Sequence, residues 1–188
     1  MSLEIILGCM YSGKSTELIK RVRNHQAIKT KVLVVNHLND NRYSTCDTAN
    51  THSGDTIHAI KLSNLQDIYT HIDNCSVVAI DEAQFFKGLY NVVVHLIETL
   101  GKHVIVAGLS GDYKRRLFGE LHLLVPLADK LMLSVAYCSI CKDGTSATFT
   151  RKIKGGAGQD VIDVGSTDKY IAVCRKHYNM AKLTDVNN

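Results

Sequence analysis

Residues 4–15 of the chain read EIILGCMYSGKS. The apolar run at 4–7 is typical of a buried strand, and residues 8–15 match the pattern G-x-x-x-x-G-K-[ST] at every defined position. The apolar residues that follow recur at helical spacing, at Leu18, Ile19 and Val22. The sequence therefore predicts a strand, a glycine-bearing loop and a helix that begins near Ser15, which is the context in which this pattern binds phosphate.

The loop has the residue types that hold a nucleoside triphosphate. Its glycines let the backbone curl so that successive N–H groups point at phosphate oxygens, at the start of a helix. Lys14 is placed to reach the β and γ phosphates, and Ser15 is placed to ligate Mg²⁺. We expect the binding loop to consist of Gly8, Cys9, Met10, Tyr11, Ser12, Gly13, Lys14 and Ser15.

Three further apolar runs predict strands, at 32–35, 77–80 and 104–107. Each is rich in β-branched residues and apolar throughout, as in strands that are covered on both faces. The stretch 89–100, closed by Gly101, predicts a helix before the last of them. Strands that alternate with helices indicate an α/β fold with a mostly parallel sheet flanked by helices.

Two acidic residues follow the strand at 77–80. Asp81 is placed to hold Mg²⁺ through water, as in other phosphate-loop enzymes. Glu82 could polarise a nucleophile, which is water in an ATPase and a substrate hydroxyl in a kinase. The alternative is that the pair merely opens a solvated loop, and the complete phosphate-binding pattern disfavours it.

The sequence pattern changes after about residue 130, where short polar stretches replace the long apolar runs. We expect residues 1–133 to form the nucleotide-binding α/β domain and residues 134–188 to form a small lobe, with a strand at 170–173 and no helix. The polar stretch 39–55 has no periodicity and predicts a mobile loop.

The lobe carries a set of residues with metal-ligand spacing. C-x₂-C is followed later by C-x₂-H, and together they offer three thiolates and one imidazole: Cys138, Cys141, Cys174 and His177. Such a set closes a tetrahedral zinc site with no open position, so the site is structural. The alternative is that the thiols are reduced core residues and the histidine lies at the surface. We expect the isolated Cys9, Cys46 and Cys75 to be small buried or loop residues.

Composition excludes several classes of protein. The chain has 188 residues, 45% of them hydrophobic, which suffices for one domain with a small appendage and excludes a disordered chain. No apolar stretch approaches the roughly 18 residues of a membrane span, and the start lacks a basic leader, so we expect a cytoplasmic protein without membrane contact. The net charge of +4 is spread along the chain and does not indicate nucleic-acid binding.

Five motifs resemble those of the zinc-containing cytosolic type of thymidine kinase, the type II thymidine kinase family. They occur in the family's order and span nearly the whole chain: GCMYSGKSTEL at 8–18, DNRYS at 40–44, DEAQFF at 81–86, GLSGDYKRRLFG at 108–119 and DKYIAVCRKHY at 168–178. The phosphate-binding loop alone would not separate this family from many others.

The resemblance implies that ATP phosphorylates the 5′-hydroxyl of thymidine, with deoxyuridine as a further acceptor, giving the monophosphate and ADP. Glu82 would be the general base, and structural Zn²⁺ would accompany Mg²⁺. The loop at 8–15 would bind ATP together with Asp40, Asn41, Arg42, Asp81, Glu82, Ala83 and Gln84. The resemblance further implies feedback inhibition by dTTP and a homotetramer.

The resemblance also implies a nucleoside pocket. Its side chains would be Met10, Leu109, Tyr113, Phe118, Thr150 and Tyr170. A lasso loop would bind the base through its backbone at Val161, Ile162, Asp163, Val164 and Gly165, with a zinc knuckle on either side. The chain departs from the family at Cys9, where proline is usual, at Ser110, where an acidic residue is common, and at 162–166, where two adjacent glycines are usual. Without the motifs, the aromatic residues would be interpreted as ordinary core residues.

Two other functions remain as hypotheses. One is an ATPase with the same phosphate-binding loop and a zinc lobe that binds nucleic acid. The basic cluster Arg151, Lys152 and Lys154 has little aromatic interleaving, which disfavours it. The other is an inactive nucleotide-binding module, which the presence of Lys14 and Glu82 disfavours.

Overall fold

A six-stranded sheet forms the centre of the computed structural model, which describes residues 1–38, 48–50, 56–153 and 169–184. The strand order is β5-β2-β6-β7-β1-β8, and every pairing in this sheet is parallel. The strands are β1 (Ser2–Gly8), β2 (Val32–His37), β5 (Ile60–Leu62), β6 (Val77–Ile80), β7 (His103–Leu109) and β8 (Lys130–Ser134). The predicted parallel α/β architecture is therefore confirmed.

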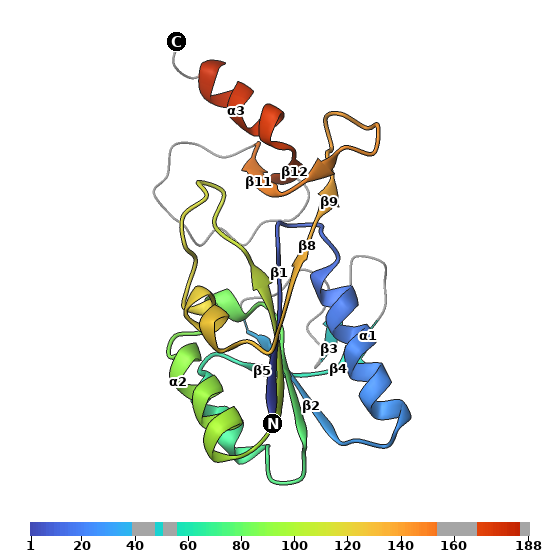
Figure 1. Cartoon of the computed structure of the whole chain (residues 1–188), viewed down its shortest axis with the longest axis vertical. Coiled ribbons are helices and arrows are strands. Elements are labelled where there is room, and N and C mark those ends of the chain that lie inside the picture. Colours follow the sequence, from blue (N-terminus) through green and yellow to red (C-terminus); the bar gives the residue numbers. More distant parts are fainter. Residues whose placement is uncertain (39–47, 51–55, 154–168, 185–188) are drawn as a thin grey trace.

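Helices cover both faces of the sheet (Figure 1). One face carries α1 (Lys14–Ala27), and the opposite face carries η1 (Leu65–Thr70), α2 (Leu89–Val94) and η4 (Leu121–Leu127). Two shorter turns, η2 (Ala83–Phe85) and η3 (His95–Thr99), complete this part of the chain. No helix among the described residues has both the length and the apolar character that crossing a bilayer requires.

Alternation along the central strands explains why their sequences are apolar throughout. Ile5 packs in the core on the α2 side, whereas Ile6 packs in the core on the α1 side. In β7, Val104 and Val106 face the first of these cores, and Ile105 faces the second. Because successive side chains of a strand point to opposite faces, a sheet covered on both sides needs apolar residues at every position.

The predicted strands at 4–7, 32–35, 77–80 and 104–107 are all present. The predicted helix at 89–100 begins at Leu89, but it changes to π-helical winding from His95 to Thr99, where the Leu100 N–H donates to the His95 carbonyl at 3.0 Å. Gly101 follows with φ +63°, a conformation that suits glycine and ends the helix.

Two edge strands were not predicted, β5 and β8. β8 has no buried apolar run of the kind that predicted the central strands. It begins with a lysine, its Leu131 and Leu133 are exposed, and the residue between these two is half-buried. Its last residue, Ser134, pairs with Gly8, so the sheet reaches the expected boundary at 133/134. The division into two domains stays a prediction.

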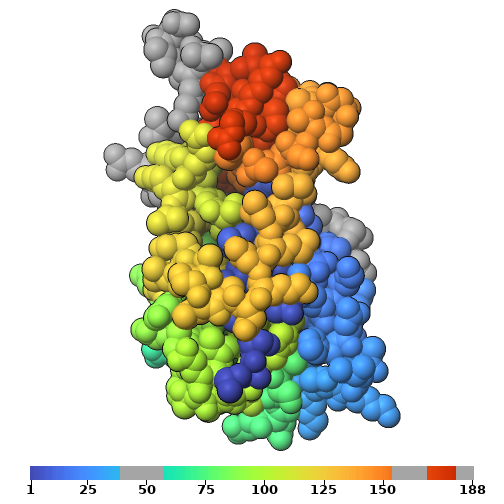
Figure 2. Space-filling view, in the orientation of Figure 1, coloured from blue at the N-terminus to red at the C-terminus, as the bar shows by residue number. Residues whose placement is uncertain are grey.

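The C-terminal lobe lies at one end of the molecule (Figure 2). It contains β9 (Ala136–Tyr137) paired with β10 (Ser146–Ala147), β11 (Phe149–Lys152) paired with β12 (Tyr170–Val173), and α3 (Arg175–Thr184). A further pair, β3 (Thr48–Asn50) and β4 (Thr56–His58), forms a separate two-stranded sheet. The strand at 170–173 is confirmed.

The expectation that the lobe has no helix is wrong. The sequence of α3 carries a short helical signal that the prediction overlooked, because Tyr178 and Ala181, like Met180 and Leu183, are three residues apart. Tertiary contacts also support the first turn of α3: the Tyr178 ring packs against the Phe149 ring at 5.4 Å between centroids, and Arg151 donates to the His177 carbonyl at 3.3 Å.

Candidate functional site

The phosphate-binding loop lies between β1 and α1, as predicted. Gly13 has φ +78° and directs the chain into the helix. Inside the loop, the Cys9 carbonyl accepts hydrogen bonds from Lys14 Nζ at 2.7 Å and from Ser12 Oγ at 2.9 Å. The loop is therefore already curled, and a buried lysine stands at the N-terminus of α1, where the helix dipole and the backbone N–H groups favour an anion.

Asp81 and Glu82 follow β6 at the same edge of the sheet. β6 and β1 both pair with β7, so the two strands lie two strand spacings, or about 10 Å, apart across the sheet, and Ile80 is level with Ile5, three residues before Gly8. Both carboxylates are buried. The Glu82 N–H donates to Asp81 Oδ1 at 2.9 Å, and Glu82 has φ +50°, which is uncommon outside glycine and concentrates at functional sites.

Gln84 orients the Glu82 carboxylate. Gln84 Nε2 donates to Glu82 Oε2 at 2.6 Å, and Gln84 Oε1 accepts the Leu109 N–H at 3.0 Å. A Cβ added at Gly108 would lie 2.6 Å from Gln84 Oε1, and one added at Gly119 would lie 2.3 Å from the Gln84 carbonyl. The two glycines therefore let the chain close around Gln84. The sequence placed Gln84 near the nucleotide but gave no signal for this orienting contact.

Four of the six predicted nucleoside-pocket residues with described side chains lie together in two pairs, and the other two contact residues outside this set. The Met10 N–H donates to Thr150 Oγ1 at 3.0 Å, so the phosphate-binding loop touches β11 of the lobe. The rings of Tyr113 and Tyr170 are neighbours, with 6.2 Å between their centroids and their planes tilted by 50°. Phe118 packs edge-on against Phe85 at 5.4 Å, and Leu109 ends β7 beside Gly8.

Other predicted residues lie outside the described part of the chain: Asp40, Asn41, Arg42 and Val161 to Gly165. The described residues on either side of the stretch 154–168 are adjacent, because the Ile153 N–H donates to the Lys169 carbonyl at 2.8 Å. The prediction that Cys9 and Cys75 are buried is confirmed, and Cys46 lies among the residues that are not described.

Asp112 was not singled out in the sequence, although it is buried beside the pocket residues. Its carboxylate accepts hydrogen bonds from the N–H groups of Lys114 and Arg116, each at 2.8 Å, and from Arg116 Nε at 2.9 Å. An aspartate that bonds the backbone two residues on is a turn former. The turn-forming aspartate was visible in the sequence, but the burial of Asp112 could not be predicted from it.

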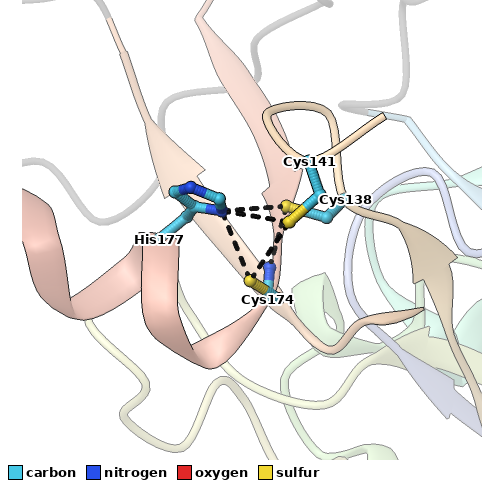
Figure 3. Close-up of side chains that lie close together, drawn as sticks. All are labelled: Cys138, Cys141, Cys174 and His177. Carbon is cyan, nitrogen blue, oxygen red and sulfur yellow. Dashed lines mark hydrogen bonds between the residues drawn. The ribbon is translucent and has the colours of Figure 1, made fainter. Parts of the chain in front are cut away.

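The predicted metal ligands converge on one point in the lobe (Figure 3). The ligand atoms of Cys138, Cys141, Cys174 and His177 all lie within 4.8 Å of one another. His177 Nδ1 lies 3.6, 3.3 and 3.4 Å from the sulfurs of Cys138, Cys141 and Cys174, and the sulfurs of Cys141 and Cys174 are 3.8 Å apart. Tetrahedral zinc bonds imply about 3.5 Å between sulfur and nitrogen and about 3.8 Å between two sulfurs, so these residues fit zinc.

The electrostatics of this cluster also favour a cation. Burial raises the pKa of the Cys138 thiol, but backbone hydrogen bonds from Cys141 and Cys174 outweigh it and lower the pKa to about 6. For Cys141, burial and the neighbouring thiols raise the pKa to about 11. One thiolate forms readily and opposes the next, because like charges at this distance repel. A divalent cation would offset that repulsion.

Comparison with known proteins gives a consistent result. The sequence profile of the thymidine kinase family matches residues 1–178. The cytosolic thymidine kinase of Gallus gallus is 39% identical over 176 residues, which cover 94% of this chain and 76% of that protein. The thymidine kinase of Fowlpox virus (strain NVSL) is 37% identical, covering 93% and 95%, and the cytosolic thymidine kinase of Homo sapiens is 38% identical, covering 94% and 72%.

We expect the purified protein to carry about one zinc ion per chain, because three thiolates and one imidazole close a complete tetrahedron. Cys174→Ser should lose this zinc, and chelation should remove the order of the lobe, since metal binding and local folding are coupled. Elemental analysis and circular dichroism measure both effects. Cys75→Ala, at a buried cysteine outside the lobe, is the control and should keep its zinc. Folded wild-type protein without zinc would contradict the assignment.

Proposed function

The chain belongs to the thymidine kinase family, and we propose that it transfers the γ-phosphoryl group of ATP to the 5′-hydroxyl of thymidine, giving dTMP and ADP. The observation that supports this most is an arrangement of neighbours. The phosphate-binding loop, the Asp81–Glu82 pair and the end of β7 share one edge of the sheet, and the loop itself touches Thr150 of the lobe. Ligands of open parallel sheets bind at this carboxyl edge.

The nucleotide would bind through its phosphates. The backbone N–H groups at the start of α1 would receive them, and Lys14 would exchange the Cys9 carbonyl for the β and γ phosphates. Mg²⁺ would be held by Ser15 and by Asp81, the latter through water. Phosphoryl transfer requires mainly positioning and charge neutralisation, which these groups supply.

Glu82 would accept the proton of the 5′-hydroxyl. Gln84 holds one carboxylate oxygen at 2.6 Å, so the orientation of the other is fixed as well. The left-handed backbone at Glu82 is a local strain that the surrounding contacts maintain. A base held in this way needs little reorganisation when the hydroxyl arrives.

The nucleoside would lie where the lobe meets the phosphate-binding loop. Met10 and Thr150 are hydrogen-bonded there, and the neighbouring rings of Tyr113 and Tyr170 offer apolar surface for a base. The backbone at 161–165 would supply the polar contacts to the base. Deoxyuridine would fit the same contacts without the methyl group and is proposed as a second acceptor.

The alternative of a nucleic-acid-dependent ATPase is not favoured, because the relatives over nearly the whole chain are named thymidine kinases. Assembly as a homotetramer stays a prediction. One feature supports self-association: β8 is an outer strand of the sheet with exposed Leu131 and Leu133, and the alternation continues through the exposed Val135 and Tyr137.

The reaction itself is the first test. With ATP and Mg²⁺, we expect dTMP and ADP to form in equal amounts from thymidine, and we expect DNA to leave the rate unchanged. Chromatography of the products, with each deoxynucleoside supplied in turn, measures this. ATP hydrolysis that rises with DNA and ignores thymidine would show that the ATPase hypothesis is correct instead.

Glu82→Gln should lower kcat by roughly 10²- to 10⁴-fold, because the amide cannot accept the proton. ATP binding should persist, since the variant keeps the size of the side chain and its contact with Gln84. Steady-state kinetics and calorimetric titration with ATP measure the two effects. Glu98→Gln, an exposed glutamate in η3, is the matched control and should be as active as the wild type. A kcat for Glu82→Gln within about threefold of wild type would remove its role as base.

We expect dTTP to inhibit and to compete with both thymidine and ATP. Its thymine would occupy the nucleoside pocket, and its triphosphate would turn back to the backbone N–H groups and Lys14. One ligand then gains both sets of contacts, whereas dCTP lacks the matching base. Inhibition patterns with thymidine and ATP each varied provide the measurement. Inhibition by dTTP no stronger than inhibition by dCTP would show that the two sites are not bridged.

A further inference from the structure

The segment that carries Tyr113 is a self-contained turn. Besides accepting the bonds from Lys114 and Arg116 described above, Asp112 donates its own N–H to the Arg116 carbonyl at 2.9 Å. The Arg115 N–H returns to the Asp112 carbonyl, also at 2.9 Å. Residues 112–116 are thus cross-linked to one buried carboxylate and move as a unit. Whatever sets the position of this turn therefore sets the position of the Tyr113 ring.

Packing does not hold this turn on all sides. A small, partly open pocket of about 100 Å³ lies against it, and its lining includes Gly111, Asp112 and Arg115 on one side and Phe149 and Thr150 of β11 on the other. Because no protein atoms pack against the turn across this pocket, a shift of the turn toward it meets little steric resistance. The contacts on its other sides must supply the missing restraint.

Tyr178 of α3 provides such a restraint. Its hydroxyl donates a hydrogen bond to the Tyr113 carbonyl at 2.8 Å. Its ring receives the Arg115 guanidinium, with the central carbon 4.4 Å from the ring centroid. One side chain thus contacts the turn at two points, and it does so from a buried position with 6% of its surface exposed.

The metal-binding knuckle in turn fixes Tyr178. Tyr178 directly follows His177, and the Tyr178 N–H donates to the Cys174 carbonyl at 2.9 Å. On the other side its ring packs against Phe149. A tyrosine held between two metal ligands and a core aromatic residue has little freedom, so its hydroxyl is a fixed point for the turn.

We propose that Tyr178 is a positioning residue for the nucleoside: it transmits the position of the Cys174–His177 knuckle to the 112–116 turn and so sets the distance between the Tyr113 and Tyr170 rings. This inference rests on the proposed function, because it takes these rings as walls of the thymidine pocket. Tyr178 acts through Tyr113, away from Lys14 and Glu82. Its loss should therefore weaken thymidine binding and leave phosphoryl transfer intact.

Tyr178→Phe removes only the hydroxyl. We expect the KM for thymidine to rise about three- to tenfold, as for the loss of one neutral hydrogen bond. The kcat, the KM for ATP and the zinc content should stay within twofold of wild type. Tyr69→Phe is the matched control, because it removes the hydroxyl of an exposed tyrosine in η1, outside the lobe and the site. It should leave all four quantities unchanged.

A double-mutant cycle with Tyr113→Ala tests the route. If Tyr178 acts through the Tyr113 ring, Tyr178→Phe should not raise the KM for thymidine further in the Tyr113→Ala background. Additive effects would overturn the inference, as would an unchanged KM in the single variant. Equal rises in the KM for thymidine and for ATP, or loss of zinc, would show a general structural role instead. A wild-type protein that does not phosphorylate thymidine would overturn the proposed function, which is a separate result.

Discussion

The absence of a side chain at Gly8 is the constraint on which the rest of the molecule depends. A Cβ there would lie 2.4 Å from Ser12 Oγ and 2.5 Å from the Ser134 carbonyl, far inside contact distance. The Gly8 carbonyl also accepts the Ser110 N–H at 3.1 Å. The phosphate-binding loop, the segment that leaves β7 and the strand that leads into the lobe therefore meet at a single backbone position. Their relative placement follows from backbone geometry, so the side chains around the site project from fixed backbone positions.

Buried polar groups cost free energy unless they are hydrogen-bonded, and in this site a few residues provide most of the partners. Gln84 satisfies Glu82 and the Leu109 N–H together, which joins the ends of β6 and β7. Asp112 accepts three hydrogen bonds and organises its turn alone. Because each of these side chains serves several segments at once, its replacement would disturb geometry at a distance as well as remove a local contact.

Much of the fold could be predicted because its signals are local. The runs at 77–80 and 104–107 are apolar at every position, which is typical of strands covered on both faces. The metal ligands are recognisable by their spacing. The edge strand β8 gave no such signal, and the helix α3 gave only a short one that was overlooked. β8 forms because Ser134 and its neighbours pair with β1, and the first turn of α3 packs through Tyr178 and Phe149. The Gln84–Leu109 contact joins segments that are distant in sequence. Asp112 bonds residues of its own turn, but its burial arises only in the folded chain.

The lobe and the phosphate-binding loop share a core. The buried residues that form it are small or bear sulfur, with one aromatic residue among them: Cys9, Cys138, Ala147, Ala172, Val173, Cys174 and Tyr178. Half-buried side chains such as Phe149 and Ile171 pack against it, and two hairpins and a helix around so small a core are the situation in which small folds depend on a metal. Cys9 belongs to the loop that curls around phosphate, and its thiol donates to the Ala147 carbonyl at 3.4 Å. A metal ion that orders the lobe therefore also stabilises the wall against which the phosphate-binding loop packs.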